Sequence, residues 1–478
     1  MRRVVLGLIP ILMAAQVPRT WTDAAVAELE VPLANPASSP VHISEEAYYK
    51  IPERTLHKTY PVYHPDREPA GYQQWLKEQE PQVVFAPGET PSDWVRAGEI
   101  VFNAPTSFGP VFFSAEDVRD RKFYEETGMP VAADGTIPFA NWVVRKKGQV
   151  ELGSMGCNTC HTRVLSDGTT VPGAQGNNPG DRQGARMLRL GARFAGEDKI
   201  LERIRGFAAQ FEMPWLASDP NRRARSMPLD ALIAAGEAIP PGVTARSNTS
   251  MFVPPQVPDL IGVQDRRFLD HTGLVRHRGI ADLMRYSTLV QDVMGFARYG
   301  DLPPRATGPG IRYSDAQLYA LAIYVYSLRP PPNPHRETEQ TARGREVFER
   351  EKCHVCHAPP FYTNNRLIPA PGFRPPAKHK SLYGVMDRRV DTDPRYTLET
   401  RKGTGYYKVP SLKGVWYRGP FGHNGWVMTL EEWFDPARLR DGYVASGFRT
   451  GGRVPGHEYG LKLPPGDKSA LLAFLRTL

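Results

Sequence analysis

The chain has 478 residues, enough for two or three domains that each bury a core of their own. Hydrophobic residues make up 41% and charged residues 23%, as is typical of soluble globular proteins, and 46 prolines with 43 glycines predict many loops. The net charge of +9 comes without a dense Lys/Arg run. We therefore expect the charge to be spread over the surface, and no nucleic acid as partner.

The first segment, "MRRVVLGLIPILMAAQ", places two arginines before a short apolar run from Val4 to Ala15. This layout predicts a secretory signal peptide, which we assign to residues 1–20, with cleavage near the small pair Ala14–Ala15. An uncleaved N-terminal anchor is the alternative. No later stretch approaches the roughly 20 apolar residues of a membrane span. We expect a periplasmic or secreted protein without a membrane span.

Residues 21–140 contain no cysteine and are predicted to form a loop-rich N-terminal extension. Within it, "RAGEIVFN" (Arg96–Asn103) spaces Gly98 and Phe102 in a G-x-x-x-F pattern that recurs later in the chain. Because one Gly–Phe pair is a weak pattern, we favour a helix packed on the following domains over a relic of a further, cysteine-free copy of the later units.

All four cysteines lie in two motifs, "GCNTCH" and "KCHVCH". Two disulfides or one structural zinc site are the alternatives for an exported protein, but both leave the histidine after each pair unexplained. In C-x-x-C-H the two thiols add to the vinyl groups of haem and the histidine becomes the proximal iron ligand. The sequence thus predicts two covalently bound haem c groups, on Cys157, Cys160 and His161 and on Cys353, Cys356 and His357.

The segments before the two motifs also match. Gly148 and Leu152 precede Cys157 by nine and five residues, and Gly344 and Phe348 stand at the same offsets before Cys353. Both segments predict a short helix that leads into the haem loop.

A second match, "VPDLIGVQDRRFLDHTGLV" (Val257–Val275) on "VPSLKGVWYRGPFGHNGWV" (Val409–Val427), pairs His271 with His423 and Arg266 with Arg418. A third pairs the helical segments Leu318–Leu328 and Ser469–Leu478. The chain therefore contains two copies of one unit, residues 141–330 and 336–478, joined by the linker "RPPPNPH". We predict a mainly α fold with two tandem cytochrome c domains, long loops and an N-terminal extension.

Tandem C-x-x-C-H units joined to "RGPFGHNGWVMTLEEWF" resemble the bacterial di-haem cytochrome c peroxidase superfamily. The fuller run "YYKVPSLKGVWYRGPFGHNGWVMTLEEWF" (Tyr406–Phe434) is most similar to the rubber-oxygenase branch, and the resemblance covers roughly Gly148 to Leu478. It implies two helical cytochrome c domains that face each other. One haem passes electrons and the other meets peroxide or dioxygen.

The resemblance gives His161 and His357 the proximal roles. In the rubber-oxygenase branch the C-terminal haem has two His ligands, and His423 matches the expected position of the second. The peroxidases use a Met or Tyr shortly after H-x-G instead. Here the only Met or Tyr residues shortly after His423 are Met428 and Tyr443. Neither lies at a suitable separation along the sequence, which argues against a strict peroxidase.

Whether His271 binds the first iron stays open in the sequence. The match with His423 favours a ligand, whereas a reactive first haem needs a vacant distal side, where His271 or His277 would act as acid or base. A thioether from one of three methionines is a further alternative: Met251, Met284 and Met294. Two His ligands on both irons would indicate a pure electron carrier, and an apolar distal pocket a dioxygenase of an alkene or polymer.

Other residues have predicted supporting roles. Arg266 and Arg418 could pair with haem propionates, and three tryptophans are candidate bridging aromatics between the haems: Trp142, Trp416 and Trp426. The expected partner is a small cytochrome or a cupredoxin, with peroxide or dioxygen as substrate. A calcium ion between the domains is a further alternative, although the sequence contains no dense cluster of carboxylates that would bind it.

Overall fold

The computed structural model describes residues 17–209, 212–213, 216, 219–245, 250, 252–299, 310–447 and 451–478. The predicted signal peptide lies outside the described residues up to Gln16. Thr20 is already part of the fold, since it is fully buried and its amide donates to Asp315 Oδ1 at 3.1 Å. Cleavage near Ala14–Ala15 would leave this contact in the mature chain. No helix of the described residues is both long and apolar enough to cross a membrane.

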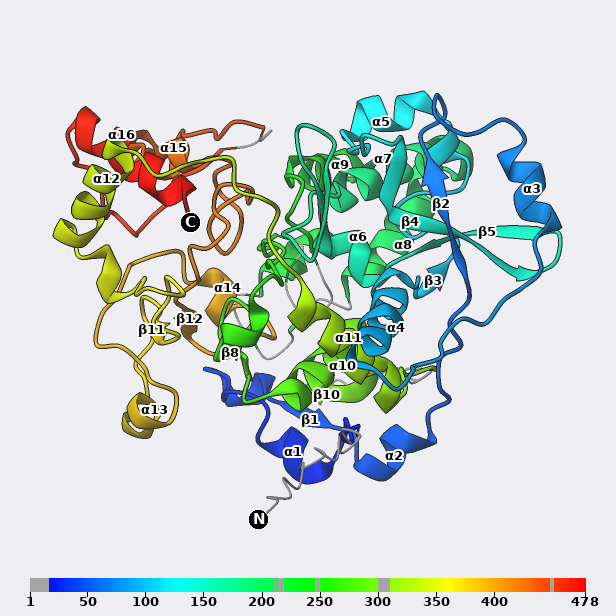
Figure 1. The fold of residues 1–478 in the computed structure, drawn as a ribbon, viewed down its shortest axis with the longest axis horizontal. Coiled ribbons are helices and arrows are strands. Elements are labelled where there is room, and N and C mark those ends of the chain that lie inside the picture. Colours follow the sequence, from blue (N-terminus) through cyan, green and yellow to red (C-terminus); the bar gives the residue numbers. More distant parts are fainter. Residues whose placement is uncertain are drawn as a thin grey trace, which may run out of the picture.

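The N-terminal part carries a four-stranded antiparallel sheet that was not predicted. Its strand order is β2-β4-β5-β3, and it lies at the right of Figure 1. The strands are β2 (Thr59–Tyr63), β3 (Ser107–Phe108), β4 (Thr136–Lys146) and β5 (Gln149–Ser154). The helices of this part are α1 (Asp23–Ala27), α2 (Glu45–Lys50), α3 (Tyr72–Glu78), α4 (Pro91–Asn103) and α5 (Arg121–Thr127).

The middle of the chain is mainly helical. Its helices are α6 (Cys157–His161), α7 (Gly180–Ala195), α8 (Glu197–Ala208), α9 (Leu229–Ala238), α10 (Ile280–Phe296) and α11 (Asp315–Ser327). Short strands pair as β6 (Thr162–Val164) with β7 (Thr170–Pro172), and β8 (Phe268–Leu269) with β9 (Val275–Arg276). Strand β1 (Pro40–His42) of the N-terminal part pairs with β10 (Ala297–Tyr299).

The C-terminal unit is drawn from yellow to red at the left of Figure 1. Its helices are α12 (Glu339–Arg350), α13 (Ala377–Leu382), α14 (Arg395–Leu398), α15 (Leu430–Trp433) and α16 (Pro465–Arg476), and its strands β11 (Leu367–Pro369) and β12 (Tyr406–Lys408) pair with each other. The proline-rich linker between α11 and α12 contains no helix or strand.

One helix pair recurs in both halves of the molecule. Helix α12 packs on α16, and α4 packs on α11 in the same way. In each pair a glycine lies at the crossing, because a Cβ at Gly344 would overlap the carbonyl oxygen of Ala470, and one at Gly98 that of Ala320. The predicted similarity of the two closing helices is thus confirmed as a shared packing position.

The first lead helix is not where the sequence placed it. Residues 149–154, predicted as a helix from Gly148 and Leu152, form strand β5, which pairs with β4. Gly148 has φ +80° in the turn between the two strands, a conformation that glycine adopts at little cost. The helix that corresponds to α12 is α4, so strands β3, β4 and β5 of the sheet lie between the lead helix and the first C-x-x-C-H motif.

The two units meet around the matched segments found in the sequence. The amide of Gln256 donates to the carbonyl of His423 at 2.8 Å, and that of Lys408 donates to the carbonyl of His271 at 2.9 Å. Gln256 and Lys408 are matched positions of the repeat, as are His271 and His423. The contact is therefore reciprocal. In each unit the residue before the V-P segment donates its amide, and the histidine of the H-x-G segment accepts at its carbonyl.

Candidate functional site

The second C-x-x-C-H motif forms one tight turn directly after α12. The amide of His357 donates to the carbonyl of Cys353 at 2.8 Å, which folds both cysteines and the histidine around one point. Cys353 packs against the core beneath α12 and α16, and burial raises the pKa of its thiol to about 11. A thiol of this kind is not a reactive surface cysteine, and its burial suits permanent attachment to an apolar group.

Both motif histidines are held by the same backbone group. Nδ1 of His161 lies 3.0 Å from the carbonyl oxygen of Pro258, and Nδ1 of His357 lies 3.1 Å from that of Pro410. The two prolines occupy matched positions in the V-P-x-L-x-G-V segments. A carbonyl can only accept, so Nδ1 carries the hydrogen and Nε2 is left with the lone pair that binds a metal.

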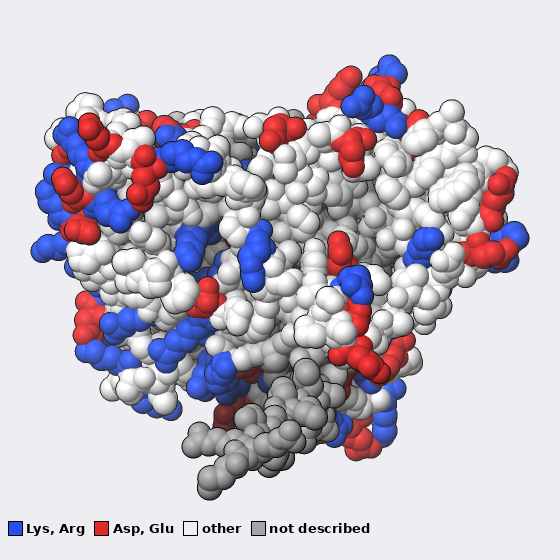
Figure 2. Space-filling model, viewed as in Figure 1, with Lys and Arg blue, Asp and Glu red and all other residues white. Residues whose placement is uncertain are grey.

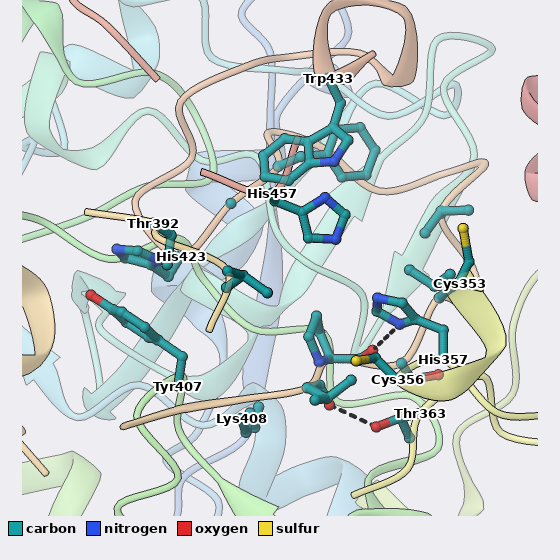
Figure 3. A pocket seen from close by; sticks show the side chains of 18 of the residues that line it. Cys353, Cys356, His357, Thr363, Thr392, Tyr407, Lys408, His423, Trp433 and His457 are labelled. Atoms are coloured by element: carbon teal, nitrogen blue, oxygen red, sulfur yellow. Dashed lines mark hydrogen bonds between the residues drawn. The ribbon is translucent and has the colours of Figure 1, made fainter. Parts of the chain in front are cut away.

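A cavity of about 280 Å³ adjoins the second motif, and Figure 3 shows part of its lining. Its apolar wall includes Phe348 from the lead helix and Leu471 and Leu475 from the closing helix. Its polar lining includes four histidines, His271, His357, His423 and His457, and five cations, Arg266, Lys352, Arg388, Lys408 and Arg418.

His457 lies opposite His357 across this cavity (Figure 3). The two imidazole centroids are 6.3 Å apart. Imidazole nitrogens bind metals at about 2 Å, so two imidazoles on opposite sides of one ion have centroids roughly 6 Å apart. Burial lowers the pKa of His357 to about 4 and that of His457 to about 3, which keeps both in the neutral, metal-binding form.

His423, the predicted second ligand, lies elsewhere on the cavity wall. Its ring stacks on Tyr407 at 4.1 Å between centroids and meets the edge of Trp426 at 4.4 Å. Its Nε2 is buried without a hydrogen-bond partner among the described residues. The geometry opposite His357 therefore favours His457 over His423. The sequence offered little sign of this, since "GHEYG" has no counterpart in the aligned segments.

The two histidines predicted to act at the first haem are engaged elsewhere. Nε2 of His271 lies 2.7 Å from the carbonyl oxygen of Gln256, and its ring lines the cavity of the second motif. His277 uses both ring nitrogens, at 2.7 Å from the carbonyl of Arg266 and 2.7 Å from the hydroxyl of Tyr326. Neither contact supports the predicted role as distal ligand, acid or base of the first haem.

The matched arginines hold the loops that carry the proline carbonyls. Arg266 donates to the carbonyl of Asp259, and Arg418 donates to that of Ser411 at 2.8 Å. Asp259 and Ser411 each follow the proline that accepts from a motif histidine. Both arginines also line the cavity, so the predicted contact with propionates stays a prediction beside this positioning role.

The lining of the second site suits a haem in polarity and charge. Burial, and after it the nearby charge of Arg266, lowers the pKa of Lys408 to about 7, and Asp259 on the same wall lies 3.7 Å from Arg418. The two propionates of a haem would bring negative charge to these cations, while the porphyrin would pack on the apolar wall. Among the described residues, no group of three or more His, Cys, Asp or Glu side chains could hold a separate metal ion such as calcium.

The first motif is fastened to the inserted sheet. The side chain of Asn158 donates to the carbonyl of Pro138 at 2.9 Å, and that of Thr159 donates to Phe139 at 2.9 Å, both on β4. Cys157 packs against the core that contains Phe102 of α4, the counterpart of Phe348. The donor set of two cysteines and a proline-bound histidine thus matches that of the second motif, and a small cavity of about 10 Å³ lies beside Cys160.

The tryptophans and methionines predicted as candidates lie in different parts of the structure. Trp426 lines the cavity, Trp416 packs beside Tyr417, and Trp142 is buried in the core of the sheet. Met284 is fully buried in the core around α10 and α11. Met251 and the side chain of Met294 lie outside the described residues.

Comparisons with known proteins give weak similarities. No family model matches the chain, and neither does a curated protein. One similar solved structure is a MauG-like protein associated with microbial copper homeostasis, with a TM-score of 0.24 and 20% identity over 37% of this chain and 60% of that one. Another is hydrazine synthase from Kuenenia stuttgartiensis, with a TM-score of 0.29 and 18% identity over 49% and 76%. The chain spans less than two thirds of the first, and similarities this weak indicate neither activity nor substrate.

Proposed function

We propose that the protein is an exported di-haem c-type cytochrome with two tandem, mainly α cytochrome c domains. The observation that carries the proposal is the repeated arrangement of two cysteines and a histidine whose Nδ1 is held by a matched proline carbonyl. Two such sites in one chain favour a redox protein over a zinc or disulfide scaffold. A zinc site would need its ligands around one ion, whereas these lie in separate units.

The two sites differ in the role we propose for them. At the second, His357 and His457 would hold the iron, and a haem iron with two histidine ligands suits electron relay. At the first, His161 is the proximal ligand, and neither His271 nor His277 is placed to occupy the opposite side. A haem with an open side reacts with peroxide or dioxygen, and we infer a peroxidase-like oxidoreductase.

Tyr313 is the group we propose to assist that reaction. It is fully buried, its hydroxyl has no hydrogen-bond partner among the described residues, and it lies near Cys157 of the first motif. A hydroxyl at this place can hold or return a proton as peroxide is cleaved. An apolar lining would suit the alternative dioxygenase instead, and a second histidine on the first iron would suit the pure carrier.

Ligand substitution tests the second site. We expect the purified protein to contain two haem c groups, and the electron paramagnetic resonance spectrum of His457→Ala to show one low-spin haem turned high-spin. His423→Ala is the matched control, a buried histidine on the same cavity wall, and it should keep the low-spin signal. The opposite pattern would return the ligand role to His423, and a protein without covalent haem would refute the proposed function.

Tyr313→Phe tests the first site. We expect turnover of hydrogen peroxide to fall about 100-fold, while both haem spectra stay unchanged. Tyr60→Phe is the control, since Tyr60 is also buried with an unpartnered hydroxyl but lies in the sheet core. Equal rates for the wild type and Tyr313→Phe would exclude the proton-transfer role.

A further inference from the structure

The net charge of the chain belongs to its C-terminal unit. Residues 1–335 contain 36 Lys+Arg and 36 Asp+Glu, whereas residues 336–478 contain 24 and 15. The expectation of an evenly spread charge is therefore wrong at the level of the two units. In Figure 2 blue side chains gather at the lower left, where α13 lies in Figure 1, whereas blue and red are mixed over α12 and α16 at the upper left.

Helix α13 presents nearly all of its side chains to solvent. His379 is 5% exposed, and the other residues of the helix are all exposed. They include Lys378 and Lys380, and Leu382, which is 53% exposed at the end of the helix. Lys378 and Leu382 are four positions apart, which places them on one face of the helix. An apolar side chain and an ammonium group therefore project into solvent side by side.

The position of α13 is fixed by contacts with both units. Nδ1 of His379 lies 2.9 Å from the hydroxyl of Tyr406 on β12. Arg267 of the first unit donates to the carbonyl of Leu382 at 3.4 Å. The exposed face of the helix is thus a preformed part of the surface.

Further cations surround the helix. Arg374 is exposed before it, and Arg389 donates to the carbonyl of Phe373 at 3.3 Å, which brings it beside Arg374. Arg267 is also exposed. We define the α13 patch by five cations and one apolar side chain: Arg267, Arg374, Lys378, Lys380, Arg389 and Leu382.

The carboxylates of this region do not cancel its positive charge. Residues 364–391 contain six basic and two acidic residues, Asp387 and Asp391. Asp387 pairs with Lys380, and Asp265 is exposed two residues before Arg267. With Arg267 and Asp265 counted, the cations around α13 still exceed the carboxylates by four. The patch therefore attracts a negatively charged surface.

We propose that the α13 patch docks the protein on a membrane surface that contains anionic phospholipids. The patch lies at one end of the molecule and projects from it, so a flat layer of headgroups can meet its cations together (Figure 1). Leu382 would enter the apolar layer while Lys378 and Lys380 stay among the phosphates. A charged polymer offers no apolar layer to Leu382. The inference goes beyond the proposed function, because docking does not depend on the haem groups.

Sedimentation of the whole, haem-loaded protein with lipid vesicles tests the docking. We expect binding to vesicles of phosphatidylglycerol and phosphatidylcholine to be at least about tenfold tighter than to pure phosphatidylcholine, and to weaken as salt screens the charges. Lys378→Glu/Lys380→Glu should weaken binding to the anionic vesicles at least about tenfold at low salt.

The matched control is Lys199→Glu/Arg203→Glu. It makes the same change of charge on two exposed residues of α8, so it should change vesicle binding less than about twofold if the patch acts locally. Leu382→Ser tests the apolar contact without a change of charge. It should weaken binding about threefold or more and leave thermal unfolding unchanged, since the side chain is exposed.

Three results would overturn the proposal. Equal binding of the wild type and Lys378→Glu/Lys380→Glu to anionic vesicles would exclude the patch as the docking site, and unchanged binding of Leu382→Ser would exclude the apolar insertion. If the wild type binds heparin but no vesicles, and the lysine variant loses heparin, the patch binds a charged polymer instead. The haem content of each protein is measured separately, and its absence would refute the proposed function without affecting the docking result.

Discussion

Asp270 and Lys402 form a buried ion pair where the two units meet. The hydroxyls of Tyr286 and Tyr396 also donate to the Asp270 carboxylate, at 3.0 and 3.1 Å. Burial raises the pKa of Asp270, but Lys402, His271 and Lys408 together outweigh it and hold the pKa well below its usual range. One carboxylate from the first unit is thus held by groups of both units, with Lys402 and Tyr396 coming from the second.

Lys402→Met should destabilise the protein by about 3–5 kcal/mol at pH 7, since it leaves a buried carboxylate without its cation. The pKa of Asp270 is lower in the folded than in the unfolded protein, so the pair stabilises the fold above about pH 4 and loses this effect as the pH falls further. The difference between variant and wild type should therefore shrink as the pH is lowered from about 4 towards the folded pKa of Asp270. Urea unfolding at several pH values measures it.

The exposed pair of Lys50 and Glu46 provides the control for this experiment. Its side chains are 73% and 78% exposed, so Lys50→Met should change the free energy of unfolding by less than about 0.5 kcal/mol. An equal effect of the two substitutions would show that the buried pair adds nothing beyond a surface contact.

At the scale of single residues, the sequence predicts the haem-attachment residues better than it predicts tertiary contacts. The motif residues are defined by their spacing, and Pro258 and Pro410 by their matched positions. His457 stands in no repeat, and its approach to His357 depends on how the chain folds back after α15. The spacing of residues along the chain does not predict a tertiary contact of this kind.

At the scale of helices and strands, the glycines of the two helix crossings are the most sensitive points. Gly98→Ala and Gly344→Ala should each destabilise the protein by about 1–3 kcal/mol, because the added methyl group meets backbone atoms of the partner helix. Gly206→Ala on α8 is the control, since nothing lies within 4 Å of its Cβ position. It should stabilise the helix by roughly 1 kcal/mol, and thermal unfolding separates the two signs.

The same scale shows why the first lead helix was misplaced. Gly148 and Leu152 match the offsets of Gly344 and Phe348, but the residues around them alternate and turn at a glycine, which is typical of a hairpin. The weaker pattern at Gly98 and Phe102 was the true counterpart. An insertion moved it away from its motif, and a comparison at fixed offsets cannot follow an insertion.

At the scale of the whole molecule, the linker contributes little to holding the units together. Besides the buried ion pair, Arg163 and Gln175 of the first unit donate to the carbonyls of Gly419 and Pro420 at 2.8 and 2.9 Å. A protease site inserted after Pro331 should therefore yield two fragments that elute together in size-exclusion chromatography. Lys402→Glu places a second carboxylate beside that of Asp270, so the two fragments of this variant should elute separately. If the fragments of the cleaved wild type also elute separately, the interface between the units is weak.

The reciprocal contact of Gln256 with His423 and Lys408 with His271 has a meaning for the history of the chain. In a two-fold symmetric homodimer, each subunit gives the other the same donor and the same acceptor. Such a dimer, once its gene was duplicated and fused, needs only a short connection such as the proline-rich linker. The two reciprocal hydrogen bonds are related to each other as they would be across such a dyad axis.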